Sequence, residues 1–465
     1  MNKKRILLKF ITYDLLASFI VWVLFMIFRK IVNDGEVFQT IIMIPNYNFL
    51  TSMYLFPLSC FFVHYLSGFY LQPEKQSRAT MFLTTLASTA IISISIFFIL
   101  LLDDIVVSYE YYYYSLLVLF GLLFITTFLS RLIVISDILY QYKTKKYTIN
   151  TVIIGNAENA LKIASDLEKN SPQNTVIGFI TTDSRIEIPK ERILGNFQQV
   201  SAIFESQKID EAIIALDNPD EQKLFNYINA LYKYDIEIRF TPRLYEILTG
   251  SARITSIGIQ PLVSITHLNM PDWQIIMKRL FDVIISFVAL ILLSPFFAYF
   301  AFRIKRDSEG PVFYLQERIG RYGKPFNIVK FRTMYENAEN GTPKLSSADD
   351  NRITPFGRIL RKYRIDELPQ FWNILKGDMS IVGPRPERRF YINQIIEDAP
   401  YYCLLYKIRP GLTSWGPIKI GYSDTIDKMI ERLNYDIIYM DSMSLLNDIK
   451  ILVLTIEIIF KGKGV

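Results

Sequence analysis

The chain has 465 residues, of which 51% are hydrophobic and 21% are charged, and its formal net charge is +6. This composition is apolar for a soluble enzyme, and it indicates a membrane-embedded part in a chain long enough for roughly two to four domains. The modest positive charge requires no nucleic-acid partner, because basic residues beside membrane spans commonly reflect topology and anionic lipid.

Two cysteines and two histidines are present, and apart from Cys60 and His64, which are four residues apart, they lie far apart in the sequence. This excludes a Cys/His zinc site, a disulfide framework and a convincing Cys-His or Ser-His-Asp machinery. Any bound metal should therefore be a hard ion held by oxygen atoms, which favours Mg²⁺ or Mn²⁺.

Four long apolar segments fill the first third of the chain, at residues 6–28, 49–71, 81–102 and 115–135. Each is close to the ~20 residues that a membrane-spanning helix needs. Basic residues precede the first segment, lie between the second and third, and follow the fourth, whereas the loop after the third is acidic. By the positive-inside rule, both ends of the bundle face the cytoplasm. We predict a transmembrane bundle of four helices over residues 1–146.

The composition then changes to that of a soluble α/β domain over residues 147–260. Apolar strand-like runs alternate with a helical pattern, which predicts a small parallel sheet. The first turn is Gly155-Asn156-Ala157-Glu158-Asn159-Ala160, with alanine where a dinucleotide-binding fingerprint has its second glycine. The sequence therefore favours a degenerate Rossmann-like domain over a cofactor-binding one.

A linker over residues 261–277 precedes a fifth apolar segment, which lies inside a region at 278–306 that is basic at both ends. Ser294-Pro295 lies near its middle, where proline removes a backbone hydrogen bond and disfavours helix just before it. Both basic flanks favour the cytoplasm, so we predict a re-entrant helix–break–helix. The alternative is a fifth span kinked at the proline, because membrane helices tolerate proline.

The region 278–465 is predicted to fold as an α/β catalytic domain with strands near 312–315 and 326–331. Its last apolar helix, 445–460, has 16 residues with three charges inside it. It should therefore be interfacial or part of a core, and not a span.

Asp366 and Glu367 are adjacent carboxylates in the stretch RIDELPQ. Neighbouring side chains on a helix diverge by ~100°, so these two cannot face each other across a bond as a glycosidase pair does. The divergence suits one acid that contacts a reacting atom and another that holds a metal. The structural alternative is that Asp366 caps a helix and Glu367 complements its dipole.

Rigid basic motifs surround this acid pair in the sequence. Two prolines clamp Arg385, which suits a guanidinium aimed at a phosphate group. Lys330 and Arg332 alternate onto one face of a predicted strand, and Arg409 directly precedes Pro410. Each motif alone could be a solvated surface, but together they indicate a diphosphate site with a lipid entrance.

From about Lys278 to Val465 the sequence resembles the bacterial sugar transferase family, the monotopic polyprenyl-phosphate phosphoglycosyl transferases. The four spans and the degenerate Rossmann-like domain resemble the large, multi-domain branch of that family. The motifs that carry the resemblance are, in order, Lys278-Arg-Leu-Phe-Asp282, Ser294-Pro295, Gly310-Pro-Val-Phe313, the loop of Gln316, Arg318 and Gly320, Lys330-Phe-Arg-Thr-Met334, Asp366-Glu-Leu-Pro-Gln370, Asn373-Ile-Leu-Lys-Gly-Asp378, Val382-Gly-Pro-Arg-Pro386 and Arg409-Pro-Gly-Leu-Thr-Ser-Trp-Gly416.

The resemblance implies transfer of a sugar 1-phosphate from a UDP-sugar to undecaprenyl (polyprenyl) phosphate. Asp366 would attack the β-phosphate and release UMP, leaving a covalent aspartyl-phosphosugar intermediate for the lipid phosphate to attack. Glu367, together with Asp366, would hold Mg²⁺. The resemblance gives Arg385 a phosphate-binding role and places the bases Lys330 and Arg361 and the acid Asp436 near the site. With Arg332 and Arg409 from the basic motifs, these are the predicted substrate-binding residues.

The resemblance further implies a multi-pass protein of the bacterial inner (plasma) membrane, in contact with membrane lipid and with its catalytic domain on the cytoplasmic face. A homodimer is expected from the large branch. The reaction would be the first membrane step of exopolysaccharide, capsule or O-antigen biosynthesis. Family members that use different sugars share these motifs, so the sequence does not single out the sugar.

Two other functions compete with this interpretation. A membrane-anchored NAD-dependent nucleotide-sugar dehydratase or epimerase would need a working glycine fingerprint and a Tyr-x-x-x-Lys pair inside the Rossmann-like domain. Tyr142 and Lys146 have that spacing, but they precede the first predicted strand. A non-catalytic membrane scaffold is disfavoured by the intact acid pair and by the two prolines around Arg385.

Overall fold

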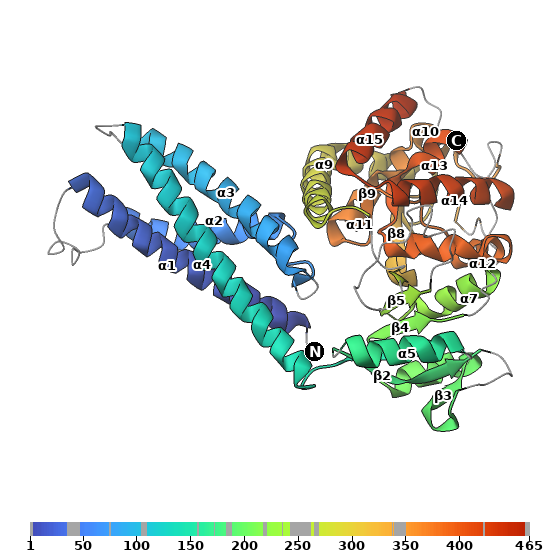
Figure 1. The fold of residues 1–465 in the computed structure, drawn as a ribbon. Coiled ribbons are helices and arrows are strands. Elements are labelled where there is room, and N and C mark those ends of the chain that lie inside the picture. Colours follow the sequence, from blue (N-terminus) through green and yellow to red (C-terminus); the bar gives the residue numbers. More distant parts are fainter. Residues whose placement is uncertain are drawn as a thin grey trace. The chain divides into compact units, whose positions relative to one another are not determined.

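A computed structural model gives the fold of the chain as two compact units (Figure 1). The first comprises residues 1–148 and 271–277, and the second comprises residues 149–270 and 278–465. The residues that the structure describes are 3–34, 47–73, 76–103, 109–155, 158–171, 173–182, 188–216, 221–234, 236–241, 262–264, 269–336, 338, 350–421 and 424–460.

The first unit is a bundle of long helices, which confirms the helical prediction for all four apolar segments. The helices are α1 (Lys3–Asp34), α2 (Tyr47–Leu66), α3 (Arg78–Asp103) and α4 (Tyr109–Lys143). In Figure 1 they lie side by side, and α4 packs against both α1 and α3. Among the described residues, the helices long and apolar enough to cross a membrane are α1, α3, α4 and a later helix, α9 (Asp272–Asp307).

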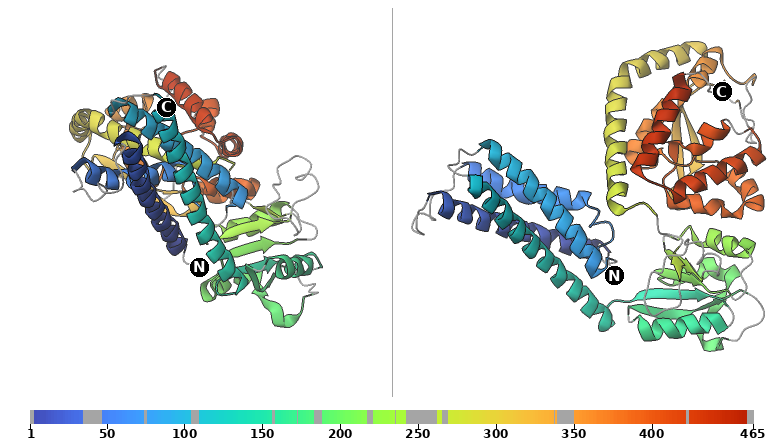
Figure 2. Two further views of the ribbon diagram at one scale, coloured as in Figure 1. Left: turned by 60° about the vertical axis from the view of Figure 1, so that its left-hand side comes forward. Right: turned by 45° about the horizontal axis from the view of Figure 1, so that its top comes forward.

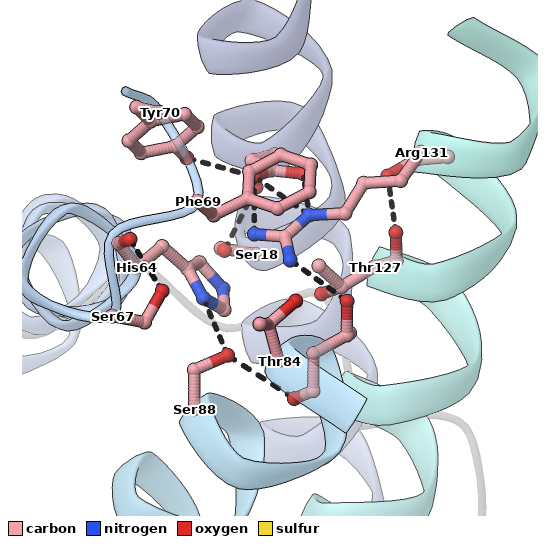
Figure 3. A network of polar contacts seen from close by, with 12 residues as sticks. Ser18, His64, Ser67, Phe69, Tyr70, Thr84, Ser88, Thr127 and Arg131 are labelled. Atoms are coloured by element: carbon pink, nitrogen blue, oxygen red, sulfur yellow. Dashed lines mark hydrogen bonds and ion pairs between the residues drawn. The ribbon is translucent and has the colours of Figure 1, made fainter. Parts of the chain in front are cut away.

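A fully buried ion pair joins the helices of this bundle (Figure 3). The Nη2 atom of Arg131 in α4 donates to the carboxylate of Asp14 in α1 at 2.7 Å, and its Nε donates to both carboxylate oxygens at 3.1 Å. The remaining nitrogen, Nη1, donates to Thr85 Oγ1 of α3 at 2.8 Å. One guanidinium therefore ties together three helices in a region where water cannot replace its partners.

The turn that follows α2 completes this network. The hydroxyl of Tyr70 donates to Asp14 at 2.7 Å, and the ring of Phe69 lies over the Arg131 guanidinium at 3.7 Å. Such a desolvated cation–π contact contributes about 2 kcal/mol. The helix α2 thus ends at Leu66, five residues before the end that the apolar pattern predicts, because the chain turns inward to cover the buried charge.

The second unit begins with a six-stranded sheet of order β3-β2-β1-β4-β5-β6. The strands β1 to β5 are parallel, as the apolar runs predict, and β6 is antiparallel to β5. Helix α5 covers one face of the sheet, while α6 and α7 cover the other. The bounds are β1 Ile149–Ile154, α5 Glu158–Asn170, β2 Asn174–Thr181, η3 Lys190–Arg192, β3 Ile193–Asn196, η4 Phe197–Gln199, α6 Val200–Ser206, β4 Glu211–Ile214, α7 Glu221–Leu231, β5 Glu237–Phe240 and β6 Val263–Ser264.

Two details of this sheet bear on the sequence predictions. A side chain at Gly155 would place its Cβ 2.3 Å from the carbonyl oxygen of Ala215, so packing between the ends of β1 and β4 requires glycine there. Asn156 and Ala157, on which the degenerate fingerprint rests, lie outside the described residues. The predicted linker 261–277 contains the short strand β6 and the first residues of the next helix.

The remainder of the second unit is built from short strands and helices. A hairpin pairs β7 with β8 in antiparallel fashion, and β9 pairs with β10 in parallel. The bounds are β7 Phe313–Ile319, η5 Arg321–Gly323, β8 Pro325–Phe331, α10 Pro355–Lys362, η6 Ile365–Gln370, α11 Phe371–Lys376, β9 Ser380–Val382, α12 Arg389–Asp398, η7 Pro400–Lys407, β10 Gly411–Thr413, α13 Trp415–Ile420, α14 Ile426–Asp441 and α15 Leu445–Phe460.

Helix α9 (Asp272–Asp307) is the predicted fifth apolar segment. The predicted break at Ser294-Pro295 is wrong as an interruption, because the helix continues through Pro295. Figure 2 shows instead that α9 bends part-way along its length. A proline inside a helix removes one backbone bond and causes such a bend without ending the helix. Its middle exposes large apolar side chains, among them Phe287, Ile291, Leu292 and Phe296.

Both ends of α9 are fixed to the second unit. Lys278 Nζ forms an ion pair with the Asp448 carboxylate of α15 at 2.6 Å. Near the other end, Asp307 Oδ2 accepts a hydrogen bond from the backbone nitrogen of Phe356 at the start of α10, at 3.1 Å. The exposed apolar middle therefore lies between two points, Lys278 and Asp307, at which the second unit binds the helix.

The buried ion pair of the bundle leads to a stability prediction. Replacing Arg131 by methionine leaves the Asp14 carboxylate buried without its counter-ion, and loss of one partner of a buried pair costs about 3–5 kcal/mol. We expect Arg131→Met to lower the free energy of unfolding in detergent by that amount. Combining it with Asp14→Leu removes both charges and should restore part of the loss.

The exposed pair of Lys9 and Asp137, 2.8 Å apart, provides the control. An exposed ion pair contributes about 1 kcal/mol or less, so Lys9→Met should change the unfolding free energy little. A double variant at Arg131 and Asp14 that is as unstable as Arg131→Met alone would contradict a charge-based role.

Candidate active site

The acid pair lies in η6, a single 3₁₀-helix that begins after Arg364. Arg364 occupies the N-cap position with a left-handed backbone (φ 54°), and Asp366 and Glu367 follow in the first turn. The capping alternative is therefore wrong for Asp366. A 3₁₀-helix has about three residues per turn, so adjacent side chains point ~120° apart and meet different surroundings.

Glu367 is buried and is bound by three basic side chains from separate elements. Its Oε1 accepts from Lys330 Nζ of β8 at 3.1 Å and from Arg385 Nη2 at 2.9 Å. Its Oε2 lies 3.5 Å from Arg364 Nη1. Burial raises the pKa of Glu367, but Arg385, Lys330 and Arg364 outweigh it and hold the pKa well below its usual range. Glu367 is therefore ionised.

Asp366, the neighbouring acid, has a different environment. The side chain is 9% exposed, and its carboxylate makes no hydrogen bond or ion pair with any residue that the structure describes. Burial and then the charge of Glu367 raise the pKa of Asp366 to about 6, against the lowering effect of Lys330 and Arg361. The site thus combines a neutralised carboxylate with an unpaired one.

Close backbone packing positions Arg385. The amide of Gly383 donates to the Thr413 carbonyl at 2.9 Å, and the amide of Gly411 donates to the Pro384 carbonyl at 2.8 Å. A Cβ at Gly411 would lie 2.1 Å from the Gly383 nitrogen, so neither glycine can carry a side chain without moving the other turn. The two turns hold each other, and Arg385 is presented to Glu367 from a rigid backbone.

The other predicted site residues divide into two groups. Arg361 donates from Nε to Thr333 Oγ1 at 2.9 Å, and its charge lowers the pKa of Asp366, so it belongs to the same locality as Lys330 and Arg385. Arg332 instead donates to the Ser308 carbonyl at 2.7 Å, at the end of α9.

Arg409 and Asp436, like Arg332, form the second group, whose contacts do not involve the acid pair. Arg409 donates from Nε to the Gly377 carbonyl at 3.0 Å, and Asp436 lies buried in α14, one turn after Arg432. Burial raises the pKa of Asp436 to about 6, with Arg432 opposing it. Among the described residues, no hydrogen bond or ion pair joins these three residues to the acid pair, and their substrate-binding roles stay predictions.

Sequence reasoning missed several charged residues around the site. Arg364, the first residue of the stretch RIDELPQ, was given no role, yet it contacts Glu367. Glu387 directly follows the prolines that flank Arg385, and it pairs with Arg318 of β7 and Arg432 of α14. The position of Glu387 beside that turn is the signal that could have revealed it.

Comparisons with known proteins identify the family of the chain. Residues 273–462 match the model of the bacterial sugar transferase family, and residues 65–242 match that of a CoA-binding domain. An uncharacterized sugar transferase of Haemophilus influenzae is 30% identical over 74% of this chain and 75% of its own length. The chain belongs to the bacterial sugar transferase family.

Other members of this family carry more specific names. An undecaprenyl-phosphate galactose phosphotransferase of Salmonella typhimurium is 30% identical, over 68% of each chain. A UDP-N-acetylgalactosamine-undecaprenyl-phosphate N-acetylgalactosaminephosphotransferase of Aeromonas hydrophila is 37% identical, over 49% of this chain and 53% of its own length. The match thus spans about half of the Aeromonas protein and two thirds of the Salmonella protein.

The acid pair offers two carboxylates to a metal ion such as Mg²⁺. Among the described residues, no group of three or more His, Cys, Asp or Glu side chains is arranged to hold a metal. Mg²⁺ usually takes only one or two carboxylates and completes its shell with water and substrate phosphates. Asp366 and Glu367 therefore fit Mg²⁺ if a phosphate group provides the remaining oxygen ligands.

The contrast between the two acids leads to a prediction about protonation. In a Glu367→Gln variant, the charge that raises the pKa of Asp366 is gone, and Lys330 and Arg385 are left without their carboxylate. The pKa of Asp366 should then fall below about 6, towards the ordinary range near 4. The measurement is a pH titration of the carboxylate infrared band in protein labelled with ¹³C-aspartate, with Asp366→Asn identifying the band.

Glu317→Gln serves as the matched control, because Glu317 is an exposed glutamate of β7. It should leave the Asp366 band unchanged. An unchanged or higher pKa of Asp366 in Glu367→Gln would show that the two carboxylates do not interact as described.

Proposed function

We propose that the chain transfers a sugar 1-phosphate from a UDP-sugar to undecaprenyl phosphate. The observation that carries the proposal is the contrast within the acid pair, in which basic residues bind Glu367 and leave Asp366 unpaired with a pKa of about 6. Such a carboxylate is largely ionised at neutral pH and is not masked by a cation. The names of the Salmonella and Aeromonas relatives support the substrate class.

In the first step, an Asp366 carboxylate oxygen attacks the β-phosphorus of the UDP-sugar. A P–O bond to Asp366 forms, the bond between the two phosphates breaks, and UMP leaves with the bonding electron pair. In the second step, a phosphate oxygen of the lipid attacks the same phosphorus, and Asp366 leaves as a free carboxylate. The product is a sugar linked to the lipid through a diphosphate.

A carboxylate attacks an anionic diphosphate slowly unless the negative charge is cancelled. Lys330 and Arg385 would provide that charge by exchanging Glu367 for phosphate oxygens, since both already lie within 3.1 Å of Glu367 Oε1. Arg361 would add a further positive charge near Asp366. Glu367, with Asp366, would hold Mg²⁺, which would supply additional neutralisation of the diphosphate.

The sugar itself differs among the relatives, with galactose in one name and N-acetylgalactosamine in the other. The shared motifs therefore act on the groups that these substrates have in common, the diphosphate and the lipid phosphate. The transfer would begin the assembly of a bacterial exopolysaccharide, capsule or O-antigen.

We also propose that α9 is re-entrant and that the protein lies in the bacterial inner membrane with its catalytic domain on the cytoplasmic face. A straight helix from Lys278 to Asp307 would extend ~44 Å at ~1.5 Å per residue. The second unit nevertheless binds both ends, and the exposed apolar middle bends (Figure 2). The bend and the two anchored ends support entry and exit on one membrane face.

The α/β domain would then be a Rossmann-like domain without a bound dinucleotide. Its strand order, 3-2-1-4-5-6, is that of doubly wound nucleotide-binding folds, which supports this part of the proposal. The domain limits predicted from the sequence and the homodimer remain expectations.

The chemical proposal predicts the behaviour of two conservative variants. Asp366→Asn removes the nucleophile and should lower UMP release from a UDP-sugar plus undecaprenyl phosphate by about 10³-fold or more. Glu367→Gln should retain some release but require about tenfold more Mg²⁺ for half-maximal rate, because one carboxylate ligand is lost. The measurement is UMP release across a panel of UDP-sugars and Mg²⁺ concentrations.

Asp398→Asn, at the exposed end of α12, is the control and should behave as wild type. Substantial turnover by Asp366→Asn would exclude the covalent mechanism. Binding of NAD⁺ by the purified protein, with no release of UMP, would instead favour the dehydratase or epimerase alternative.

The topological proposal predicts one-sided labelling of α9. Cysteines placed at Trp273 and at Lys305, both exposed near opposite ends of the helix, should react only with reagents on the cytoplasmic side. The native Cys60 and Cys403 are buried and should give little background. Labelling of the two positions from opposite sides of the membrane would establish a full span.

A further inference from the structure

A buried group of three charged residues lies beside the turn that presents Arg385. Glu387 is 4% exposed, and its Oε2 accepts from Arg318 Nη1 of β7 at 3.1 Å. Its Oε1 accepts from Arg432 Nη2 of α14. The proposed reaction gives no role to any of these residues, and buried charges in such a cluster require an explanation.

The same contacts hold the backbone on either side of Glu387. Arg318 Nη1 also donates to the Pro386 carbonyl at 3.1 Å. The amide of Ile319, the next residue of β7, donates to the Glu387 carbonyl at 3.0 Å. The segment that directly follows Arg385 is therefore fixed to β7 by both its main chain and its carboxylate.

Arg432 is held equally firmly on the other side of Glu387. A Cβ at Gly416 in α13 would lie 2.2 Å from Arg432 Cγ, so the helix backbone presses directly on the arginine stem. The guanidinium of Arg432 is thus confined between α13 and Glu387. Any movement of the Glu387 carboxylate would have to displace a packed helix.

Charge explains why a carboxylate stands at this position. Burial raises the pKa of Glu387, but Arg432, Arg318 and Arg385 outweigh it and lower the pKa, so Glu387 is ionised. Without its charge, the guanidinium of Arg318 would lose the carboxylate with which it pairs, and Arg432 would keep only its interaction with Asp436. Their repulsion would act on Arg385, which forms an ion pair with Glu367.

We infer that Glu387 is a positioning residue for Arg385, held by Arg318 and Arg432, and that it acts on the reaction only through Arg385. This inference rests on the proposed function, in which Arg385 binds the diphosphate. A buried ion pair with a purely structural role would stabilise the domain without coupling to Arg385, and the two roles give different results in a double-mutant cycle.

The experiment compares four proteins: wild type, Glu387→Gln, Arg385→Gln and the double variant. In the wild-type background, Glu387→Gln should lower kcat/KM for UMP release by about tenfold, with most of the loss in KM for the UDP-sugar. In the Arg385→Gln background, the same substitution should change kcat/KM by less than about twofold, because the residue through which it acts is absent. Equal losses in both backgrounds would overturn the inference.

The α/β domain provides a matched control in Glu211, another buried glutamate, which pairs with Arg239 at 2.9 Å. Glu211→Gln should lower the melting temperature and leave kcat/KM unchanged. If Glu387→Gln does not fold, Arg432→Gln takes its place in the same cycle, with Glu387 still held by Arg318. A Glu387 variant that changes only the melting temperature, as Glu211→Gln is expected to do, would assign Glu387 a structural role.

The affinity for UDP, measured by calorimetry on the same four proteins, separates this inference from the proposed function. Absence of UMP release from the wild type would refute the proposed function alone. The positioning role would still be supported if Glu387→Gln lowers the UDP affinity of the wild type but not that of Arg385→Gln. It would be refuted if Glu387→Gln lowers the UDP affinity equally in both backgrounds.

Discussion

The charge of Glu367 is the interaction on which the rest of the site depends. Lys330, Arg364 and Arg385 come from a strand, a helix start and a proline-bounded turn, and their positive charges would repel one another without this carboxylate. With it, the three basic groups are held close together in a mostly buried site before any substrate is bound. Groups arranged in advance in this way need little reorganisation when charge develops on a phosphate, which is the main electrostatic contribution of enzymes to catalysis.

The different state of Asp366 follows from the same interaction and from local backbone geometry. Because η6 is a 3₁₀-helix, the two neighbouring side chains point ~120° apart, and of the two only Glu367 forms ion pairs with the described basic groups. The negative charge of Glu367 then raises the pKa of Asp366, which burial has already raised. One acid thus organises the cations, while the other has no ion-pair partner among the described residues.

The sequence predicts the features that are encoded locally. Apolar segments of ~20 residues identify the bundle helices, and the short motif around Asp366 identifies the acid pair. Partners that meet from distant positions are not encoded in any periodicity: Arg131 meets Asp14 across 117 residues, and Arg432 meets Glu387 across 45. The sequence predicts only part of the geometry of α9. Pro295 indicates a lost hydrogen bond, but it does not determine whether packing keeps the helix continuous.

The membrane helix and the charged site share one small apolar core. Phe297 and Phe300, in the second half of α9, pack against Phe331 of β8 with ring centroids 5.3 and 6.0 Å apart. Phe331 directly follows Lys330, whose ammonium binds Glu367. The strand that carries this cation is therefore packed against the helix whose apolar middle is exposed. Lipid that covers the middle of α9 would therefore also stabilise the helix against which the strand carrying Lys330 packs.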